Sequence, residues 1–379
     1  MVRDRQLRAA RLLKERRLAC AVFADPASTV YLTGYVPPVE TGPSPFEGGP
    51  PLVVLTADGG ALLIVSDIEE PAARGRATVD EVIAYRAYSP SENLPREDGY
   101  REALMQALDK ARFRGGALGI EGAVPHHATA WVAQVFRGAE FTSVSECLNP
   151  IRMVKDSDEV AAIRKAADIS VAGQRAVRQL VRPGLSEVEL FAAVRGQMEQ
   201  AFGRRLPVLA DLVSGPRSAE VGGAPSSRTV GEGEVVLVDL VPCVDGYWGD
   251  TCVTVFLGPA PEAELRQAHR VVVEALQKGI EAVKPGMTAS ELDAIVRGHV
   301  RKFGYDYPHH TGHGVGTTWH EGPRIVAGDR TVLRPGMVIA LEPGVYVDGR
   351  FGVRVEDLLL VTESGAEVLS HHDKSLIVP

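Results

Sequence analysis

The stretch VVLVDLVPCVDGYWGDTCVTVF, residues 235–256, places two carboxylates, Asp239 and Asp250, in an otherwise apolar and β-branched run. Such a run predicts two buried strands joined by a hairpin turn at Asp245–Gly246. A buried carboxylate is costly unless a cation meets it. Folding the stretch about this turn predicts that Asp239 and Asp250 lie almost opposite each other, roughly 5 Å apart. Two acids at that separation need a proton or a metal ion between them.

A second hairpin repeats this arrangement about 100 residues later in the chain. The segments LEPGVYVDG and GVRVEDLLLVT place Glu342 and Glu356 on either side of the Asp348–Gly349 turn. If the two hairpins pack about a pseudo-twofold axis, four carboxylates converge, and oxygen ligands favour hard divalent ions such as Mn²⁺, Mg²⁺ or Ca²⁺. The alternative, that these acids form strand-end ion pairs or turns, would have to hold for both hairpins together.

An internal repeat supports such a duplication. VRPGLSEVELFAAVRG, residues 181–196, and VKPGMTASELDAIVRG, residues 283–298, are identical at nine of sixteen positions. Each predicts a Pro-Gly turn, then a Ser or Thr near the helix N-cap with Glu three residues later, then an amphipathic helix. Residues 151–379 are therefore expected to form two related α+β halves.

Four histidines fall within HHTGHGVGTTWHEGP, residues 309–323, shortly before Glu342. An isolated histidine is more often a core or surface residue than a ligand, but this clustering favours a metal-binding or catalytic role. One imidazole added to the carboxylates moves the expected metal toward Mn²⁺, Co²⁺, Zn²⁺ or Fe²⁺. The pairs His126/His127 and His371/His372 lack this context and are expected at the surface.

The rest of the chain indicates an ordinary globular protein of two domains. It has 379 residues, 45% hydrophobic and 24% charged, and a net charge of −8 that argues against a nucleic-acid partner. The four cysteines have no metal-finger spacing and predict reduced core thiols in a cytoplasmic protein. No apolar window approaches a membrane span or a secretory signal, so we expect no membrane partner.

The first 150 residues alternate helix and strand patterns. We expect an α/β domain with a helix near 4–16, the strand ACAVFAD, the segment TVYLTGYV, a hairpin from LVVLT to GALLIVS, and a helix over 99–110. The Gly/Pro-rich loop at 36–51 is long enough for a lid. Asp156 and Glu159 have capping-box spacing, which places the domain boundary at 148–156 and predicts domains of residues 1–150 and 151–379.

These motifs resemble the methionine aminopeptidase/prolidase/creatinase metallopeptidase family. The resemblance spans about 151–370 and, more weakly, 5–145 through TVYLTGYV. It implies a creatinase-type N-terminal domain followed by a pita-bread catalytic domain with an internal pseudo-twofold repeat. The separate N-terminal domain points to the branch of aminopeptidase P, Xaa-Pro dipeptidase and creatinase. The motif positions that match the family's five metal ligands are Asp239, Asp250, His313, Glu342 and Glu356.

By this resemblance, Asp250 and Glu356 bridge two divalent metal ions, Asp239 completes one coordination sphere, and His313 with Glu342 complete the other. Mn²⁺ is the expected metal, and Co²⁺, Zn²⁺ or Fe²⁺ would fit the same ligands. Glu342 is expected to shuttle the proton.

The same resemblance implies roles for three residues outside the metal set, and a homodimer. His320 is expected to contact the substrate near the scissile bond. His309 and Arg354 match pocket residues for which structural hydrogen bonding is an equal alternative.

Two departures from the family pattern bear on function. SGPRSAEVGG, residues 214–223, has Gly222 where the family usually carries a substrate-binding histidine, and Thr251-Cys252-Val253-Thr254 departs from the usual Thr-Arg-Thr. We hypothesise that Arg217 or a residue of the 36–51 loop substitutes for the histidine. The predicted activity is hydrolysis of Xaa-Pro bonds in a short peptide, as a dipeptidase or an aminopeptidase. Hydrolysis of a small non-peptide C–N bond, as in creatinase-like or ectoine-hydrolase-like relatives, remains open, as does an inactive binding module.

Overall fold

The computed structural model describes residues 1–38, 42 and 44–377. Part of the predicted 36–51 loop, residues 39–41 and 43, lies outside the described residues. The chain divides into two compact units, Met1–Arg152 and Met153–Pro379. Within the described ranges, none of the helices has both the length and the apolar character needed to cross a membrane.

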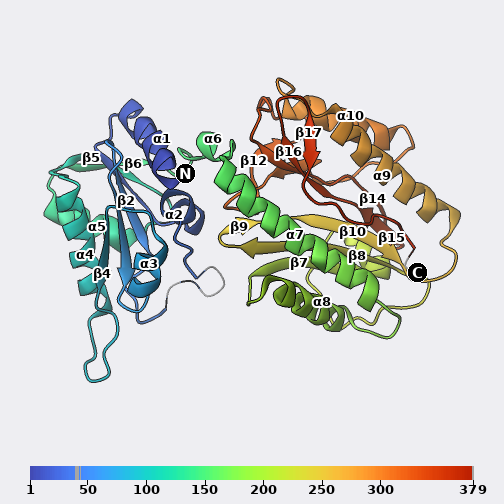
Figure 1. Ribbon diagram of the computed structural model, residues 1–379, viewed down its shortest axis with the longest axis horizontal. Coiled ribbons are helices and arrows are strands. Elements are labelled where there is room, and N and C mark those ends of the chain that lie inside the picture. The colour runs from blue at the N-terminus through green and yellow to red at the C-terminus, as the bar shows by residue number, and fades with distance from the viewer. Residues whose placement is uncertain (39–41, 43, 378–379) are drawn as a thin grey trace. The chain divides into compact units, whose positions relative to one another are not determined.

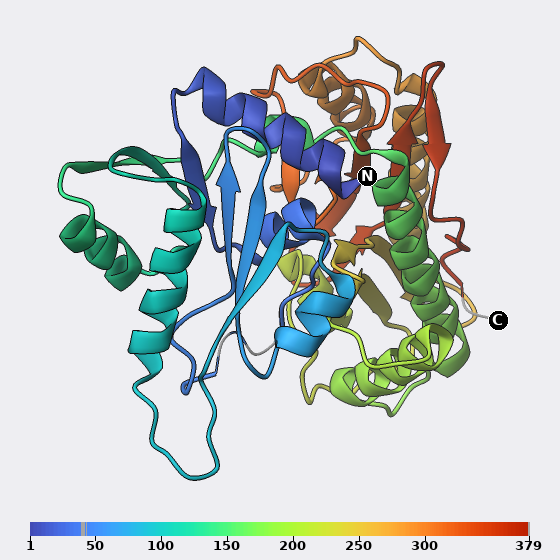
Figure 2. The ribbon, with the colours of Figure 1, turned by 60° about the vertical axis from the view of Figure 1, so that its left-hand side comes forward.

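The first unit is built on a six-stranded mixed sheet with the order β4-β3-β2-β1-β5-β6. The pairs β1–β2 and β2–β3 are antiparallel, and the others are parallel. Helices α4 and α5 pack on one face of the sheet, whereas α1, α2 and α3 pack on the other (Figures 1 and 2). The strands are β1 Cys20–Phe23, β2 Leu52–Thr56, β3 Ala61–Ser66, β4 Glu81–Tyr85, β5 Gly116–Ile120 and β6 Ala139–Ser143. The helices are α1 Val2–Glu15, α2 Pro26–Thr33, α3 Glu70–Arg76, α4 Arg96–Lys110, α5 His126–Val135 and α6 Asn149–Arg152.

Much of the segment TVYLTGYV lies in helix α2, and local signals explain its bounds. Asp25 caps the helix by accepting a hydrogen bond from the Ala27 N–H, and Pro26 occupies the first helical position. Gly34 then ends the helix in the left-handed conformation, with φ of 74°. The predicted helices over 4–16 and 99–110 and the predicted hairpin correspond to α1, α4 and β2–β3.

The second unit contains two larger sheets, each covered by a pair of helices (Figure 1). One sheet has the order β10-β8-β7 and packs against α7 and α8, while the other has the order β12-β11-β13-β16-β17 and packs against α9 and α10. The helices are α7 Ser157–Leu180, α8 Glu187–Phe202, α9 Ala263–Ala282 and α10 Ala289–Arg301, and the short 3-10 helix η1 covers Gly215–Glu220. The strands of the first half are β7 Val208–Ser214, β8 Val235–Val244, β9 Tyr247–Trp248 and β10 Thr251–Phe256. Those of the second half are β11 Gly312–Gly314, β12 Glu321–Ile325, β13 Val338–Leu341, β14 Gly344–Val347, β15 Phe351–Arg354, β16 Asp357–Val361 and β17 Ala366–Val368.

The sequence repeat is a structural repeat. Ser186 caps α8 and Thr288 caps α10, and each forms a full capping box with the glutamate three residues later. Asp156 and Glu159 form the same box at the start of α7. All four cysteines are buried and unpaired, as the sequence predicts.

The register of the first hairpin differs from the prediction. Asp245 and Gly246 both adopt positive φ, 51° and 85°, and form a two-residue turn. This turn sets Asp239 opposite Cys252, so the prediction that Asp239 faces Asp250 is wrong by two residues. Because side chains alternate along a strand, Asp250 still lies on the same face as Asp239, in the diagonal position.

The second hairpin contains a break in its ladder. β13 pairs with β16 as far as Leu341 and Asp357, and β14 pairs with β15 from Gly344 and Arg354 onward, in the same register. Glu342 and Glu356 occupy the break between these two pairs. The continuous register places them opposite each other, as predicted.

Candidate metal centre

A cavity of about 480 Å³ opens between the two halves of the second unit. It is lined by strands from both halves, and every site residue predicted from the sequence contributes to it. These residues are Asp239, Asp250, His309, His313, His320, Glu342, Arg354 and Glu356.

The acids in this cavity are arranged as cation ligands. Asp239, Asp250, Glu342 and Glu356 are all buried. Over the described part of the chain, Asp239 Oδ1, Asp250 Oδ1 and Glu356 Oε2 are buried without a hydrogen-bond partner. Leaving such oxygens unsatisfied is costly, and a divalent cation would satisfy them.

Electrostatics lead to the same requirement for a cation. Burial raises the pKa of Asp239 to about 6, even though the Arg354 guanidinium opposes the shift. Burial and the neighbouring carboxylates raise the pKa values of Asp250 and Glu356 well above their usual range. These side chains lack sufficient positive charge around them to ionise together, and divalent metal ions would supply it.

His313 in β11 is oriented for metal ligation. Its Nδ1 lies 3.0 Å from the carbonyl oxygen of Gly314 and therefore donates to it, which leaves the Nε2 lone pair free for a metal. Nε2 lies 3.6 Å from Asp250 Oδ2 and 3.4 Å from Glu342 Oε1. Ligand atoms of Asp250, His313 and Glu356 all lie within 4.8 Å of one another. Burial lowers the pKa of His313 and keeps the ring neutral, as a metal ligand must be.

His310 belongs to the site but was not predicted individually. Its Nε2 lies 2.8 Å from Glu342 Oε1, and its ring centre lies 5.2 Å from those of His313 and His320. Burial acts to raise the pKa of Glu342, but His310, His313 and Arg354 bring it down to about 2. The histidine cluster was visible in the sequence, but spacing alone could not separate His310 from its neighbour.

His320 and His309 have different surroundings. The centre of the His320 ring lies 3.9 Å from the ring centre of Trp319 and 4.0 Å from that of His313. Burial and the nearby imidazoles lower the pKa of His320 to about 3. His309 uses both ring nitrogens: Nδ1 donates to the His310 carbonyl oxygen at 2.7 Å, and Nε2 accepts from the Tyr346 hydroxyl at 2.9 Å. Burial lowers the pKa of His309 to about 4. These bonds favour the structural alternative for His309.

Arg354 on β15 joins two carboxylates of the first half. Its Nη2 donates to Asp239 Oδ2 at 2.7 Å and to Asp211 Oδ2 at 3.1 Å, and its Nη1 donates to the carbonyl oxygen of Val221 at 2.6 Å. Arg354 thus holds Asp239 in position. Asp211, on β7, was not predicted to belong to the site.

The structure does not support the substitution of Arg217 for the missing histidine. The Arg217 guanidinium donates to Glu187, to the Ser226 hydroxyl and to the Ala224 carbonyl oxygen. Beside Gly222 lies instead the carboxylate of Asp211: a Cβ on Gly222 would stand 2.1 Å from Asp211 Oδ2. The space next to residue 222 is therefore filled by an acid from β7.

The expectation that His372 lies at the surface is wrong. Its side chain is only 2% exposed. Nε2 lies 2.9 Å from the carbonyl oxygen of Glu356, to which it donates, and Asp357 Oδ1 is 3.2 Å away. The segment that follows β17 folds back over β16 and buries this ring, which sequence periodicity does not reveal. His371 is exposed, as expected.

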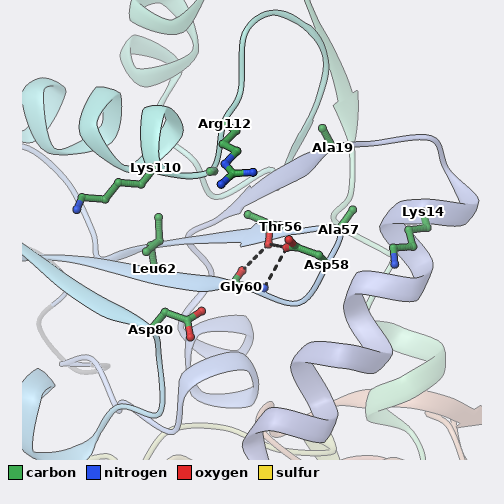
Figure 3. Close-up of a pocket in the computed structure, with 11 residues that line it drawn as sticks. Lys14, Ala19, Thr56, Ala57, Asp58, Gly60, Leu62, Asp80, Lys110 and Arg112 are labelled. Atoms are coloured by element: carbon green, nitrogen blue, oxygen red, sulfur yellow. Dashed lines mark hydrogen bonds between the residues drawn. The ribbon is translucent and has the colours of Figure 1, made fainter.

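A second cavity, of about 560 Å³, lies in the first unit, and its acids are already engaged (Figure 3). Asp58 accepts from the Thr56 hydroxyl and the Gly60 N–H, and Asp80 pairs with Arg3 and accepts from the Ala61 N–H. Among the described residues, the groups with metal-ligand spacing all lie in the second unit.

Both units of the chain match known protein families. Residues 161–363 match metallopeptidase family M24, and residues 5–154 match the creatinase/prolidase N-terminal domain. The chain is 36% identical to an Xaa-Pro dipeptidase of Pyrococcus furiosus over 69% of this chain and 75% of that protein. The structure resembles the prolidase of Pyrococcus horikoshii OT3 with a TM-score of 0.83 and 27% identity, over 99% of this chain and 100% of that one. It also resembles the X-Pro aminopeptidase of Thermotoga maritima MSB8 with a TM-score of 0.83 and 25% identity, over 99% of each chain.

These matches confirm the expected family and the pita-bread architecture, and the family implies divalent metal ions. The chain belongs to metallopeptidase family M24 and carries a creatinase/prolidase N-terminal domain ahead of its catalytic unit.

Proposed function

We propose that this protein is a dinuclear metal-dependent peptidase that hydrolyses Xaa-Pro dipeptides. The observation that carries the proposal is the convergence of Asp250, His313 and Glu356, with buried oxygens lacking partners, in a chain similar to Xaa-Pro dipeptidases. Hydrolysis of a stable amide needs an activated water and a stabilised oxyanion, and this set of ligands is suited to provide both.

We assign the metal ligands as Asp239, Asp250, His313, Glu342 and Glu356. Two divalent ions bound there would lower the pKa of a shared water and polarise the scissile carbonyl. We propose Mn²⁺ as the native metal because four carboxylates and one imidazole form a predominantly hard ligand set, with Co²⁺, Zn²⁺ and Fe²⁺ as competitors.

The other site residues position and move protons. Glu342 Oε1 lies 2.8 Å from His310 Nε2, and the pKa of Glu342 is low, so the ionised carboxylate can take the proton of the attacking water and deliver it to the leaving nitrogen. His320 is neutral and faces the cavity, where its ring N–H can contact the peptide near the scissile bond. Arg354 orients Asp239, and His309 supports Arg354 through the hydroxyl of Tyr346.

Three further features complete the proposal. The chemistry resides in a domain of residues 151–379, preceded by a domain of residues 1–150. The protein works as a homodimer in the cytoplasm, where its four buried thiols stay reduced. Light scattering at several concentrations tests the dimer, and a monomer throughout would refute it.

The decisive experiment is a metal-reconstitution assay. Chelated protein is reloaded with Mn²⁺, Co²⁺, Zn²⁺ or Fe²⁺, and release of proline from Ala-Pro is followed, with Ala-Ala as the control dipeptide. We expect Mn²⁺ to restore Ala-Pro hydrolysis with little turnover of Ala-Ala. Absence of Ala-Pro hydrolysis with every metal would refute the function.

Aminopeptidase activity is the second candidate, because the likeness to the Thermotoga maritima X-Pro aminopeptidase extends over nearly the whole chain. Adding Ala-Pro-Ala to the assay separates the two. A dipeptidase cleaves Ala-Pro well and the tripeptide poorly, whereas an aminopeptidase cleaves the tripeptide at least as well. An ectoine-type substrate in the same screen tests the non-peptide reaction.

A further inference from the structure

Asp211 is a carboxylate of the cavity that the proposed mechanism does not use. It lies on β7 directly opposite Asp239 on β8, with both side chains on the same face. Like charges directly opposite in a sheet are destabilising unless a cation lies between them. The single guanidinium of Arg354 serves both carboxylates, so the negative charge of the pair is only partly offset.

The Asp211 carboxylate is held in a fixed orientation. The Gly223 N–H donates to Oδ1 at 2.9 Å, and Arg354 Nη2 donates to Oδ2 at 3.1 Å. Val221, a β-branched residue, has a φ of 79°, and its carbonyl oxygen accepts from Arg354. Such a backbone conformation persists only where its surroundings enforce it, so the 221–223 turn is shaped around Asp211 and Arg354.

Asp211 also remains accessible from the cavity. Its side chain is 37% exposed, whereas that of Asp239 is 12% exposed. A carboxylate has about four acceptor positions, and the two hydrogen bonds above use only part of them. The remaining positions are open to a ligand in a cavity whose nearby walls, Leu209 and Ala224, are apolar.

We propose that Asp211 is a specificity-determining residue that accepts hydrogen bonds from a substrate ammonium group. An ammonium has three donors and a compact charge, which suits a fixed and accessible carboxylate next to apolar walls. The ammonium is either the free α-amino group of the N-terminal residue or the side chain of an N-terminal lysine. This inference deepens the proposed Xaa-Pro hydrolysis and rests on it.

The test uses Asp211→Asn in the full-length, metal-loaded protein, with Asp348→Asn as the matched control. The amide of the Asp211→Asn variant keeps the shape of the carboxylate and removes its charge. Asp348 lies in the exposed β14–β15 turn, so its replacement changes the net charge equally without touching the cavity. Steady-state constants are measured with Ala-Pro, Lys-Pro and Glu-Pro.

If the α-amino group is the ligand, Asp211→Asn raises KM for all three dipeptides by about tenfold. If the lysine side chain is the ligand, the ratio of kcat/KM for Lys-Pro over Glu-Pro falls by about tenfold, while Ala-Pro is unchanged. Unchanged KM values and an unchanged ratio would overturn the proposal. A uniform loss of kcat at constant KM would also overturn it, since that result assigns Asp211 to positioning Arg354. If the wild-type protein cleaves none of the three, the proposed function itself has failed.

Gly222→Ala provides an independent test that leaves Asp211 in the chain. Gly222 is not in the left-handed region, so alanine is compatible with its backbone, but the new Cβ would displace the Asp211 carboxylate. We expect Gly222→Ala to reproduce the effect of Asp211→Asn on KM or on the substrate ratio. In an Asp211→Ala background, Gly222→Ala should have no further effect. Full additivity of the two changes would overturn the assigned contact.

Discussion

The two halves of the catalytic unit have the same plan but supply their carboxylates differently. In the first half, Asp239 lies within the unbroken strand β8, whereas Asp250 lies in the gap between β9 and β10, which both pair with β8. In the second half, Glu342 and Glu356 face each other at a break between two shorter ladders. The second half also contributes His313, whereas the first half contributes only acids.

The difference indicates which half depends more on bound metal. The strand that carries Asp239, β8, is paired on both sides, with β7 and with β10, and Arg354 offsets part of the charge of Asp239. At the break in the second half, Glu342 and Glu356 do not pair with each other, and each N–H instead donates to a single carbonyl oxygen, that of Thr311 at 2.9 Å and that of Cys252 at 3.0 Å. We therefore expect the loss of a metal ligand from either half to lower catalytic activity to a similar extent. Loss of the metal should lower the local stability of the second half more than that of the first.

The largest effects should come from removing one ligand of each half. Asp250→Asn and Glu356→Gln should each lower kcat/KM for Ala-Pro by about 10³-fold or more, because each change removes a charged oxygen from the metal site. Metal content by mass spectrometry should fall in parallel. Asp245→Asn, in the exposed β8–β9 turn, serves as the control and should keep full activity. If only one of the two ligand variants loses metal, the assignment of both acids to one shared site is wrong.

Removal of the metal should affect the two halves unequally. Any ligand that binds only the folded state stabilises it, by about 4 kcal/mol at a thousandfold excess over Kd. Chelation should therefore lower Tm, and hydrogen exchange should increase more around 342–343 and 355–356 than along β8 and β10. Adding Mn²⁺ back should reverse both changes. Equal increases in the two halves would contradict the comparison.

The features that were predicted most accurately from the sequence depend on residues that lie close together in the chain. The capping boxes at Ser186 and Thr288 and the Asp-Gly turns are set within a few residues, so the duplicated halves could be recognised without a structure. The diagonal placement of Asp250 was missed because the turn geometry, rather than the apolar pattern, decides the register.

The placements that sequence reasoning missed depend on distant partners. Asp211 belongs to the site because of Arg354, 143 residues away in the chain. His372 is buried because the segment after β17 folds back over β16. His309 and His310 are adjacent and chemically identical, and only the packed structure shows that His310 approaches Glu342 more closely, at 2.8 Å against 3.9 Å for His309.

A partly buried histidine distinguishes α9 from its counterpart α7. His269 on α9 lies against the C-terminal segment, where its ring is hydrogen-bonded to the backbone of Lys374. Burial lowers its pKa to about 4, with Arg178 contributing in the same direction. At this residue, the unfolded chain therefore binds more protons than the native protein between about pH 6.5 and pH 4. The stability that neutral His269 contributes is present above pH 6.5 and is lost as the pH falls through that range.

Loss of this contribution should cost on the order of 3 kcal/mol of unfolding free energy by pH 4. His269→Gln removes the titration and should flatten the acid side of the stability profile, measured by urea unfolding at a series of pH values. An unchanged profile would show that His269 does not titrate in this range.

The smallest expected effects are on the unfolding free energy, and they test whether the helices of the two halves are stabilised equally by their N-caps. Ser186 and Thr288 each accept a hydrogen bond from the N–H of the glutamate three residues on, and each glutamate bonds back to the N-cap N–H. Ser186→Ala and Thr288→Ala should each lower the unfolding free energy by about 1 kcal/mol, because each leaves one helix-end N–H without its partner. Ser186→Thr and Thr288→Ser keep a hydroxyl and should cost much less. Since both caps have the same geometry, a clear inequality between the two alanine variants would show that the halves differ in their helices as well as in their ligands.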